Sequence, residues 1–106
     1  MSSGKNRLNI HPRIQLLDRN GLVAAIYSNR GNALNKLGQQ DEAISDFTKA
    51  IELNPKLPDA YAGRGIASSL LGKKDDAKRD LQMALALKPA LRPQIQRISD
   101  QFKLGL

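Results

Sequence analysis

The sequence predicts an all-α fold, an α–α superhelix in which two helical hairpins are packed side by side. Two stretches, 27–55 and 61–89, match each other at a constant offset of 34 residues. Within each stretch, apolar and small residues recur at spacings of three and four, which is the period of one helix face. A glycine and then a proline interrupt both stretches at the same places, so each stretch is expected to form two helices.

The matching positions fix the family that the chain resembles. They are Tyr27/Tyr61, Arg30/Arg64, Gly31/Gly65, Ala33/Ala67, Leu37/Leu71, Gly38/Gly72, Asp41/Asp75, Ala43/Ala77, Asp46/Asp80, Ala50/Ala84, Leu53/Leu87 and Pro55/Pro89. A 34-residue period carrying these residues is similar to the tetratricopeptide repeat (TPR). The resemblance implies repeat 1 over 24–57, repeat 2 over 58–91 and a capping helix over 92–104.

The boundaries of the helices follow from local chemistry. The first helix of each unit is expected over about 27–37 and 61–71, and the second over about 41–53 and 75–87. Gly38 and Gly72 end the first helices, because glycine adopts the left-handed conformation of a helix C-terminus without steric cost. Asp41 and Asp75 stand where a carboxylate can cap the second helix. Gly31 shares a helix face with Tyr27, so the two helices of a unit are expected to pack closely there.

The two ends of the chain are predicted to differ from the repeats. Residues 1–21 are assigned to a polar tail, Met1–Asn9, and a short helix of about 12–19 that ends at Asn20–Gly21. This segment does not continue the repeat, and it is expected either to cover the first unit or to dock on another subunit. Residues 22–106 form the TPR domain. Its last helix places Ile95, Ile98 and Phe102 on one face, and its outer face is polar, with Gln94, Arg97, Gln101 and Lys103.

Composition excludes several classes of protein. There is no cysteine, so neither disulfides nor cysteine-ligated metals are expected. No apolar run is long enough to span a bilayer, and no signal-peptide core follows Met1, so a cytoplasmic location is expected. The formal net charge is +7. Because the basic residues are not interleaved with aromatic ones, docking on nucleic acid or an anionic membrane is only a third interpretation.

No arrangement of residues predicts catalysis. His11 is the only histidine, and no carboxylate or second ligand lies near it in the sequence. The glycines of Gly63-Arg64-Gly65 fall within a predicted helix rather than between a strand and a helix, which excludes a dinucleotide loop. The chain is therefore expected not to be an enzyme and to hold no cofactor and no metal.

The resemblance implies a protein–protein interaction scaffold, whose first helices line a concave groove for a peptide or helix of a partner protein. The groove residues expected here are Ser28, Asn29, Asn32, Asn35, Lys36, Asp59, Ala62, Ile66, Ser69 and Leu70. Asparagine amides both donate and accept, and so they suit an extended peptide backbone. The alternative is self-assembly, with Ile14, Leu17, Ile66 or Leu70 packed on a second copy.

One subfamily can be compared residue by residue. The string Tyr27–Gly31 resembles the middle unit of the TPR domains that bind chaperone tails with a carboxylate clamp, with Asn29 as the clamp asparagine. The following unit of such a domain supplies a lysine and an arginine. This chain has Asp59 and Gly63 at those positions, so the clamp is incomplete.

Overall fold

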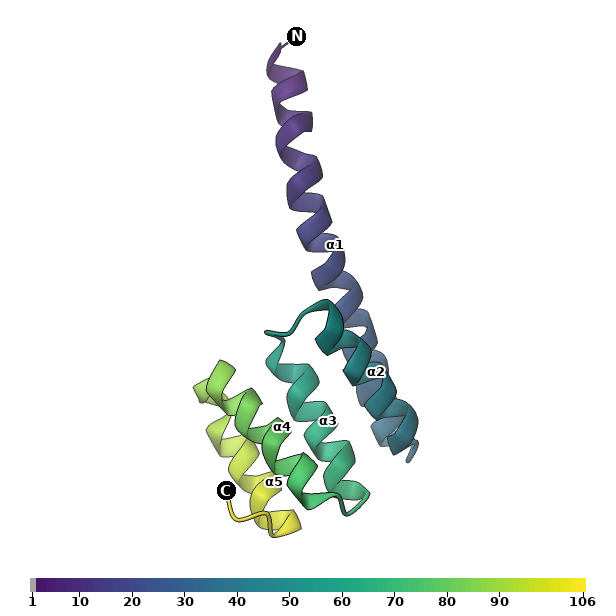
Figure 1. Cartoon of the computed structure of the whole chain (residues 1–106), viewed down its shortest axis with the longest axis vertical. Coiled ribbons are helices and arrows are strands. Elements are labelled where there is room, and N and C mark those ends of the chain that lie inside the picture. The colour runs from purple at the N-terminus through teal and green to yellow at the C-terminus, as the bar shows by residue number, and fades with distance from the viewer. Residues whose placement is uncertain (1) are drawn as a thin grey trace.

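The computed structural model describes the backbone of residues 2–106 and the side chains of residues 19–106. Every regular element among these residues is helical. In order, they are α1 (Ser2–Lys36), α2 (Gln40–Leu53), α3 (Pro58–Leu70), α4 (Lys74–Leu87), the 3₁₀ turn η1 (Pro89–Leu91) and α5 (Arg92–Phe102). The predicted all-α class is thus confirmed (Figure 1). Within the same residues, no helix combines the length and the apolar character needed to cross a membrane.

The helices form two hairpins followed by a closing helix (Figure 1). The α1–α2 hairpin packs on the α3–α4 hairpin, and α5 packs on α3 and α4. The central helix is α3, because it alone contacts α1, α2, α4 and α5. The second helices of the two hairpins, α2 and α4, do not touch each other, and so the face of α3 between them remains open.

Two glycines end the first helices as predicted. Gly38 and Gly72 have φ angles of 80° and 78°, in the left-handed region that only glycine adopts readily. The next backbone N–H in each case, that of Gln39 or Lys73, donates back to a carbonyl of the last helical turn at 2.9 and 2.8 Å. This bond pattern satisfies carbonyls that the ending helix leaves free.

The capping role predicted for the first-turn carboxylates is wrong. The residues before the second helices are Gln39 and Lys73, and neither makes a side-chain capping bond. Asp41 and Asp75 lie inside the first turn of α2 and α4. There their negative charges still interact favourably with the positive end of the helix dipole.

Glycines hold the helices close together, as the small-residue pattern predicts. A Cβ added to Gly31 would lie 2.9 Å from ring atoms of Phe47, and one added to Gly65 would lie 2.8 Å from Cγ of Leu81. Both gaps are closer than any real side chain tolerates. Gly63 was not predicted to share this role, yet its added Cβ would lie 2.2 Å from Cζ of the same Phe47. One phenylalanine on α2 therefore contacts the backbones of both neighbouring first helices.

The apolar core forms two clusters. The first cluster joins small residues of α1, α2 and α3 around Phe47, and the second joins α4 and α5 around Leu81. Ile95 and Leu104 are buried in the second cluster, with Ile98 and Phe102 packed against it. Gln94, Arg97, Gln101 and Lys103 are all exposed, which confirms the predicted polar outer face of the closing helix.

The helix break predicted at Asn20–Gly21 is wrong, because α1 runs through both residues. Each residue costs a helix only about 1 kcal/mol relative to alanine, which the helical segments on either side offset. The short helix expected over 12–19 is part of this longer helix. Met1 lies outside the described residues, as do the side chains before Arg19, so the assignment of residues 1–21 to a separate segment stays a prediction.

Candidate partner-binding groove

A hydrogen bond fastens the first helices of the two repeats together. Asn35 on α1 donates from Nδ2 to the backbone carbonyl of Gly63 on α3, at 3.1 Å. That bond places the Asn35 side of α1 against α3. Ser28 precedes Asn35 by two helical turns, so it lies on the same side. The boundary between α1 and α3 is therefore where the predicted groove has to form.

Two of the predicted groove residues are buried and do not face a partner. Ser28 is only 3% exposed, in keeping with its position on the α3 side of α1. Ser69 is also buried, and its hydroxyl donates to the carbonyl of Gly65 one turn earlier, at 2.9 Å. The prediction that these two serines are exposed is wrong, because a pattern within one helix does not show how closely its neighbour packs.

The remaining predicted residues include a connected strip. Asn32 and Lys36 are exposed on α1, and their counterparts one repeat later, Ile66 and Leu70, are half-buried and exposed on α3. Ala62, half-buried, precedes Ile66 by one turn. Because α1 and α3 lie against each other, these residues form a strip with a polar half on α1 and an apolar half on α3.

Asn29 and Asp59 lie at the edges of this strip. Both are exposed. Gly63, the counterpart of Asn29, lies against Phe47 of the preceding helix. By the symmetry of the repeat, Asn29 therefore lies on the side of α1 away from α3. Asp59 begins α3 as a first-turn carboxylate.

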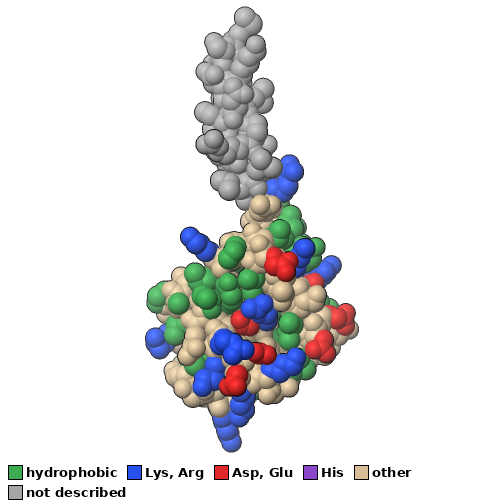
Figure 2. Space-filling model, viewed as in Figure 1, with side chains coloured by type: hydrophobic (Ala, Val, Ile, Leu, Met, Phe, Trp, Pro, Cys, Tyr) green, Lys and Arg blue, Asp and Glu red, His purple; other side chains and the backbone are tan. Residues whose placement is uncertain are grey.

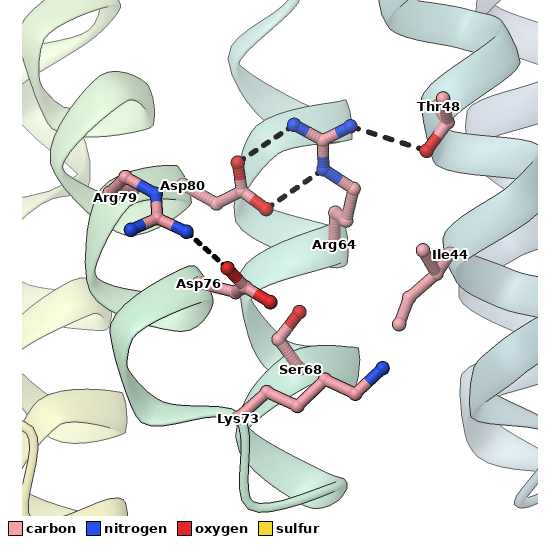
Figure 3. A pocket seen from close by; sticks show the side chains of 8 residues that line it. All are labelled: Ile44, Thr48, Arg64, Ser68, Lys73, Asp76, Arg79 and Asp80. Carbon is pink, nitrogen blue, oxygen red and sulfur yellow. Dashed lines mark hydrogen bonds and ion pairs between the residues drawn. The ribbon is translucent and has the colours of Figure 1, made fainter.

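A hollow opens on another side of α3, between α2 and α4. It has a volume of about 260 Å³ and is lined by Ile44, Thr48, Arg64, Ser68, Lys73, Asp76, Arg79 and Asp80. These side chains extend into the hollow from α2, α3 and α4 and from the turn before α4 (Figure 3). Sequence reasoning did not predict this hollow.

A bidentate ion pair forms one wall of the hollow and recurs in both repeats. Arg64 donates from Nε and Nη2 to the two carboxylate oxygens of Asp80, at 2.8 and 2.9 Å. Arg30 makes the same two bonds to Asp46, at 2.6 and 2.8 Å. The signal in the sequence was the pair of opposite charges, 16 residues apart, that repeats with the 34-residue period.

Each arginine is held further by its surroundings. The guanidinium groups lie over the rings of Tyr27 and Tyr61, 5.5 and 5.9 Å from the ring centroids. The pKa of Arg64 is raised above its ordinary value. The main cause is its hydrogen bonding to Asp80, and the negative charge of Asp80 adds to it, whereas partial burial acts in the opposite direction. The guanidinium thus remains charged throughout the neutral and mildly alkaline pH range.

The charges around the hollow are largely neutralised within the protein. Arg79 donates to Asp76 beside the Arg64–Asp80 pair. On the face drawn in Figure 2, basic and acidic side chains are interspersed rather than separated. The arrangement stabilises the packing of the repeats, and it leaves no aligned nucleophile and base. The part of the chain with described side chains brings no three His, Cys, Asp or Glu together as a metal site, and the side chain of His11 lies outside it.

Comparison with known proteins agrees with this geometry. Two tetratricopeptide repeat models match the chain, one over residues 24–57 and the other over residues 47–79. A search of curated proteins gave no match. Among solved structures, the chain is similar to the first TPR of Spaghetti (RPAP3) bound to the HSP90 peptide SRMEEVD. The TM-score is 0.67 at 24% sequence identity, and the alignment covers 96% of this chain and 89% of the other.

The chain belongs to the tetratricopeptide repeat family. Its two hairpins, its Gly–Phe and Gly–Leu contacts and its closing helix are the parts that define such a domain. As a member of this family, it is a protein–protein interaction module.

Proposed function

We propose that the chain is a non-catalytic scaffold that binds a peptide or helix of a partner protein along the strip between α1 and α3. The observation that carries the proposal is the contrast across this boundary, with exposed Asn32 and Lys36 on one side and Ile66 and Leu70 on the other. An amide and an ammonium group can bond the backbone or carboxylates of a partner, while the apolar pair receives one of its side chains. The Asn35–Gly63 bond keeps the two halves in register.

The fitting partner is a segment with an apolar side chain next to acidic or backbone acceptor groups. Lys36 supplies a cation on one half of the strip, and Asp59 at the start of α3 disfavours carboxylates near that end. Because Asp59 and Gly63 stand where a carboxylate clamp has a lysine and an arginine, we expect the peptide SRMEEVD, bound by the similar solved structure, to bind this chain no better than a scrambled version of itself. Isothermal titration calorimetry would measure both.

The experiment for the strip uses paired variants. Asn32→Ala combined with Ile66→Glu changes one residue on each half, and both side chains are at least partly exposed, so helicity by circular dichroism should be unchanged. Affinity capture with quantitative mass spectrometry would then lose the partners that the wild-type chain enriches. Met83→Glu, at an exposed position on α4, is the matched control and should retain them. Equal capture by the double variant and the wild-type chain would move the binding site away from this strip.

A further inference from the structure

The side of α1 that faces away from α3 carries apolar residues at the same repeat positions as a buried side of α3. On α3, Ala60 and Ala67 are fully buried in the cluster around Phe47 of α2. Their counterparts one repeat earlier are Ile26 and Ala33. Ile26 is 57% exposed and Ala33 is also exposed. Among the residues with described side chains, none covers α1 as α2 covers α3.

The uncovered side continues along α1 as an apolar stripe. Leu22 is 63% exposed and Leu37 is 71% exposed, and both share the helix face of Ile26 and Ala33. The stripe is about 22 Å long at the helical rise of 1.5 Å per residue. Asn29 is exposed on the same face and interrupts the stripe between Ile26 and Ala33. Large apolar side chains gathered and exposed along one helix face mark an interaction site rather than ordinary surface. We call the residues Leu22, Ile26, Ala33 and Leu37 the open stripe.

The exposure of the two equivalent arginines, Arg64 and Arg30, shows that a covering helix is missing from this side of α1 within residues 19–106. Arg64, covered by α2, has a side chain that is 25% exposed, and its third nitrogen donates to Thr48 at 3.2 Å. The equivalent Arg30 is 64% exposed. Across the hollow, Thr48 lies opposite Arg64 and Ile44 lies opposite Ser68. Because the residue numbers rise along α2 as they fall along α3, the two helices are antiparallel. The missing cover is therefore a helix antiparallel to α1.

The amino-acid sequence contains such a helix, one repeat length before α2. The residues that α2 turns toward α3 include Ile44, Thr48 and Ile51, and 34 positions earlier stand Ile10, Ile14 and Leu17. The residues inside the α1–α2 hairpin have polar counterparts. Ala43 corresponds to Asn9, and Phe47, which also contacts α3 at Gly63, corresponds to Arg13. The segment 6–19 thus keeps Ile10, Ile14 and Leu17 for covering a following helix, with Arg13 in place of the Phe47 contact, and lacks the apolar residues needed to form a hairpin with a preceding helix.

The path of the backbone determines whether this segment can cover the open stripe of its own chain or that of a second copy. Because α1 is continuous through Asn20–Gly21, it carries its N-terminal half beyond the other helices (Figure 1). To reach the open stripe of its own chain, the segment would need a turn that the helix does not make. We propose that two copies of the chain pair through α1, antiparallel, and that residues 6–19 of each copy cover the open stripe of the other.

The repeat gives the register of this dimer. Shifting the Thr48–Arg64 contact back by one repeat places Ile14 of one copy opposite Arg30 of the other. In that register Leu22 lies opposite Leu22 of the second copy, on the two-fold axis. The far end of each chain is closed by α5, whose outer face is polar. Because both copies use the same surface, the open stripe together with residues 6–19, the pairing gives a closed dimer rather than a filament.

Sedimentation equilibrium on the full chain over a wide range of concentrations tests the proposal. The expected mass is twice that of one chain. Ile26→Glu should raise the dimer dissociation constant by about 100-fold or more, because it places a carboxylate in an apolar contact, while the circular dichroism spectrum stays the same. Met83→Glu, exposed on α4, is the matched control and should leave the dimer intact. A wild-type chain that stays monomeric at every concentration would overturn the proposal.

Crosslinking separates the dimer from other arrangements. The chain has no cysteine, so Leu22→Cys introduces a single thiol. A short bis-maleimide should join two copies through it, since the two thiols meet at the axis. Leu37→Cys is the control. Its two thiols would lie about 45 Å apart in this register, at 1.5 Å per residue, and should not be joined. Crosslinking at Leu37 but not at Leu22, or at neither, would contradict the antiparallel pairing.

Salt distinguishes this apolar dimer from a charge-driven complex. Each copy has a formal net charge of +7, so the two copies repel each other. Raising NaCl from about 50 to 500 mM shortens the screening length and should lower the dimer dissociation constant. Weaker association at high salt would indicate an interface made of charge pairs and would contradict the proposal.

Discussion

Arg64 donates two hydrogen bonds, of 2.8 and 2.9 Å, to the carboxylate of Asp80, and Arg30 donates the same two bonds to Asp46 one repeat earlier. Each pair joins the two helices of one hairpin. Arg64 differs by a third bond, to Thr48 at 3.2 Å, which ties its hairpin to the preceding one. In the first repeat the ion pair therefore joins only the two helices of its own hairpin. In the second repeat the arginine of the pair also joins its hairpin to the preceding one.

We expect the second pair to matter more for stability than the first. Asp80→Ala leaves Arg64, which is largely covered by α2, without its carboxylate, and should lower the free energy of unfolding by about 2–4 kcal/mol. Asp46→Ala should cost clearly less, because the more exposed Arg30 can be hydrated instead. Urea unfolding followed by circular dichroism measures both variants.

The control for this prediction is a pair on the surface. Asp76 and Arg79 are one turn apart on α4 and both are exposed. Asp76→Ala should change stability by less than about 0.5 kcal/mol. Because Arg64 has a raised pKa in the folded protein, its contribution is present throughout the neutral range and declines only as strongly alkaline pH approaches that pKa. A loss of the Asp80 effect on going from neutral to mildly alkaline pH would contradict this assignment.

The second prediction concerns the contact of Phe47 with two helix backbones. Gly63→Ala adds a methyl group 2.2 Å from the ring, so the helices must separate or the ring must move. The expected cost is about 1–3 kcal/mol, even though alanine favours helices. Thermal unfolding measures it. Combining Gly63→Ala with Phe47→Leu should cost less than the sum of the two single changes.

Gly21→Ala is the matched control, in the same kind of helical position. Nothing lies within 4 Å of the added Cβ, and so only the helix propensity changes. The variant should gain stability, or helical content in α1, by up to about 1 kcal/mol. If Gly63→Ala were as harmless as Gly21→Ala, the close approach of α3 to Phe47 would be disproved.

Comparison of these glycines indicates what a sequence can and cannot predict. Gly38 and Gly72 were assigned correctly, because a glycine at a helix end has one local physical role. The sequence pattern predicts a break at Gly21, although a glycine costs a helix only about 1 kcal/mol. The packing role of Gly63 cannot be predicted from its own helix, because it depends on Phe47, which lies 16 residues away on another helix.

The groove residues illustrate the same limit. The helical period identified the side of α1 that carries Asn32 and Lys36, and these are exposed. It could not show that Ser28, on the adjoining side, is closed off by the neighbouring repeat, nor that Asn35 bonds the backbone of α3. Packing between repeats depends on the backbone separation, which small residues on both helices set together.

The third prediction tests the bond that joins the two sides of the groove. Asn35→Leu removes the amide that donates to the carbonyl of Gly63 and should lower the free energy of unfolding by about 1 kcal/mol or more. It should also alter the groove. In ¹H–¹⁵N NMR spectra, amide shifts are expected to change at Gly63 and Ile66 on α3. Changes confined to α1 would indicate that the bond does not couple the repeats.

The fourth prediction tests whether α5 closes the array. Ile95 is buried against Leu81 and Ala84 of α4, whereas its neighbour Gln94 is exposed. Ile95→Ala should cost about 2–4 kcal/mol, because the contact is fully buried and a cavity remains. Gln94→Ala should be nearly neutral. Hydrogen exchange can locate the effect, since stability in a repeat array is a sum of units and their interfaces. Faster exchange is expected in α3 and α4 before α1 and α2, and equal acceleration in all helices would mean that the two hairpins unfold only as one unit.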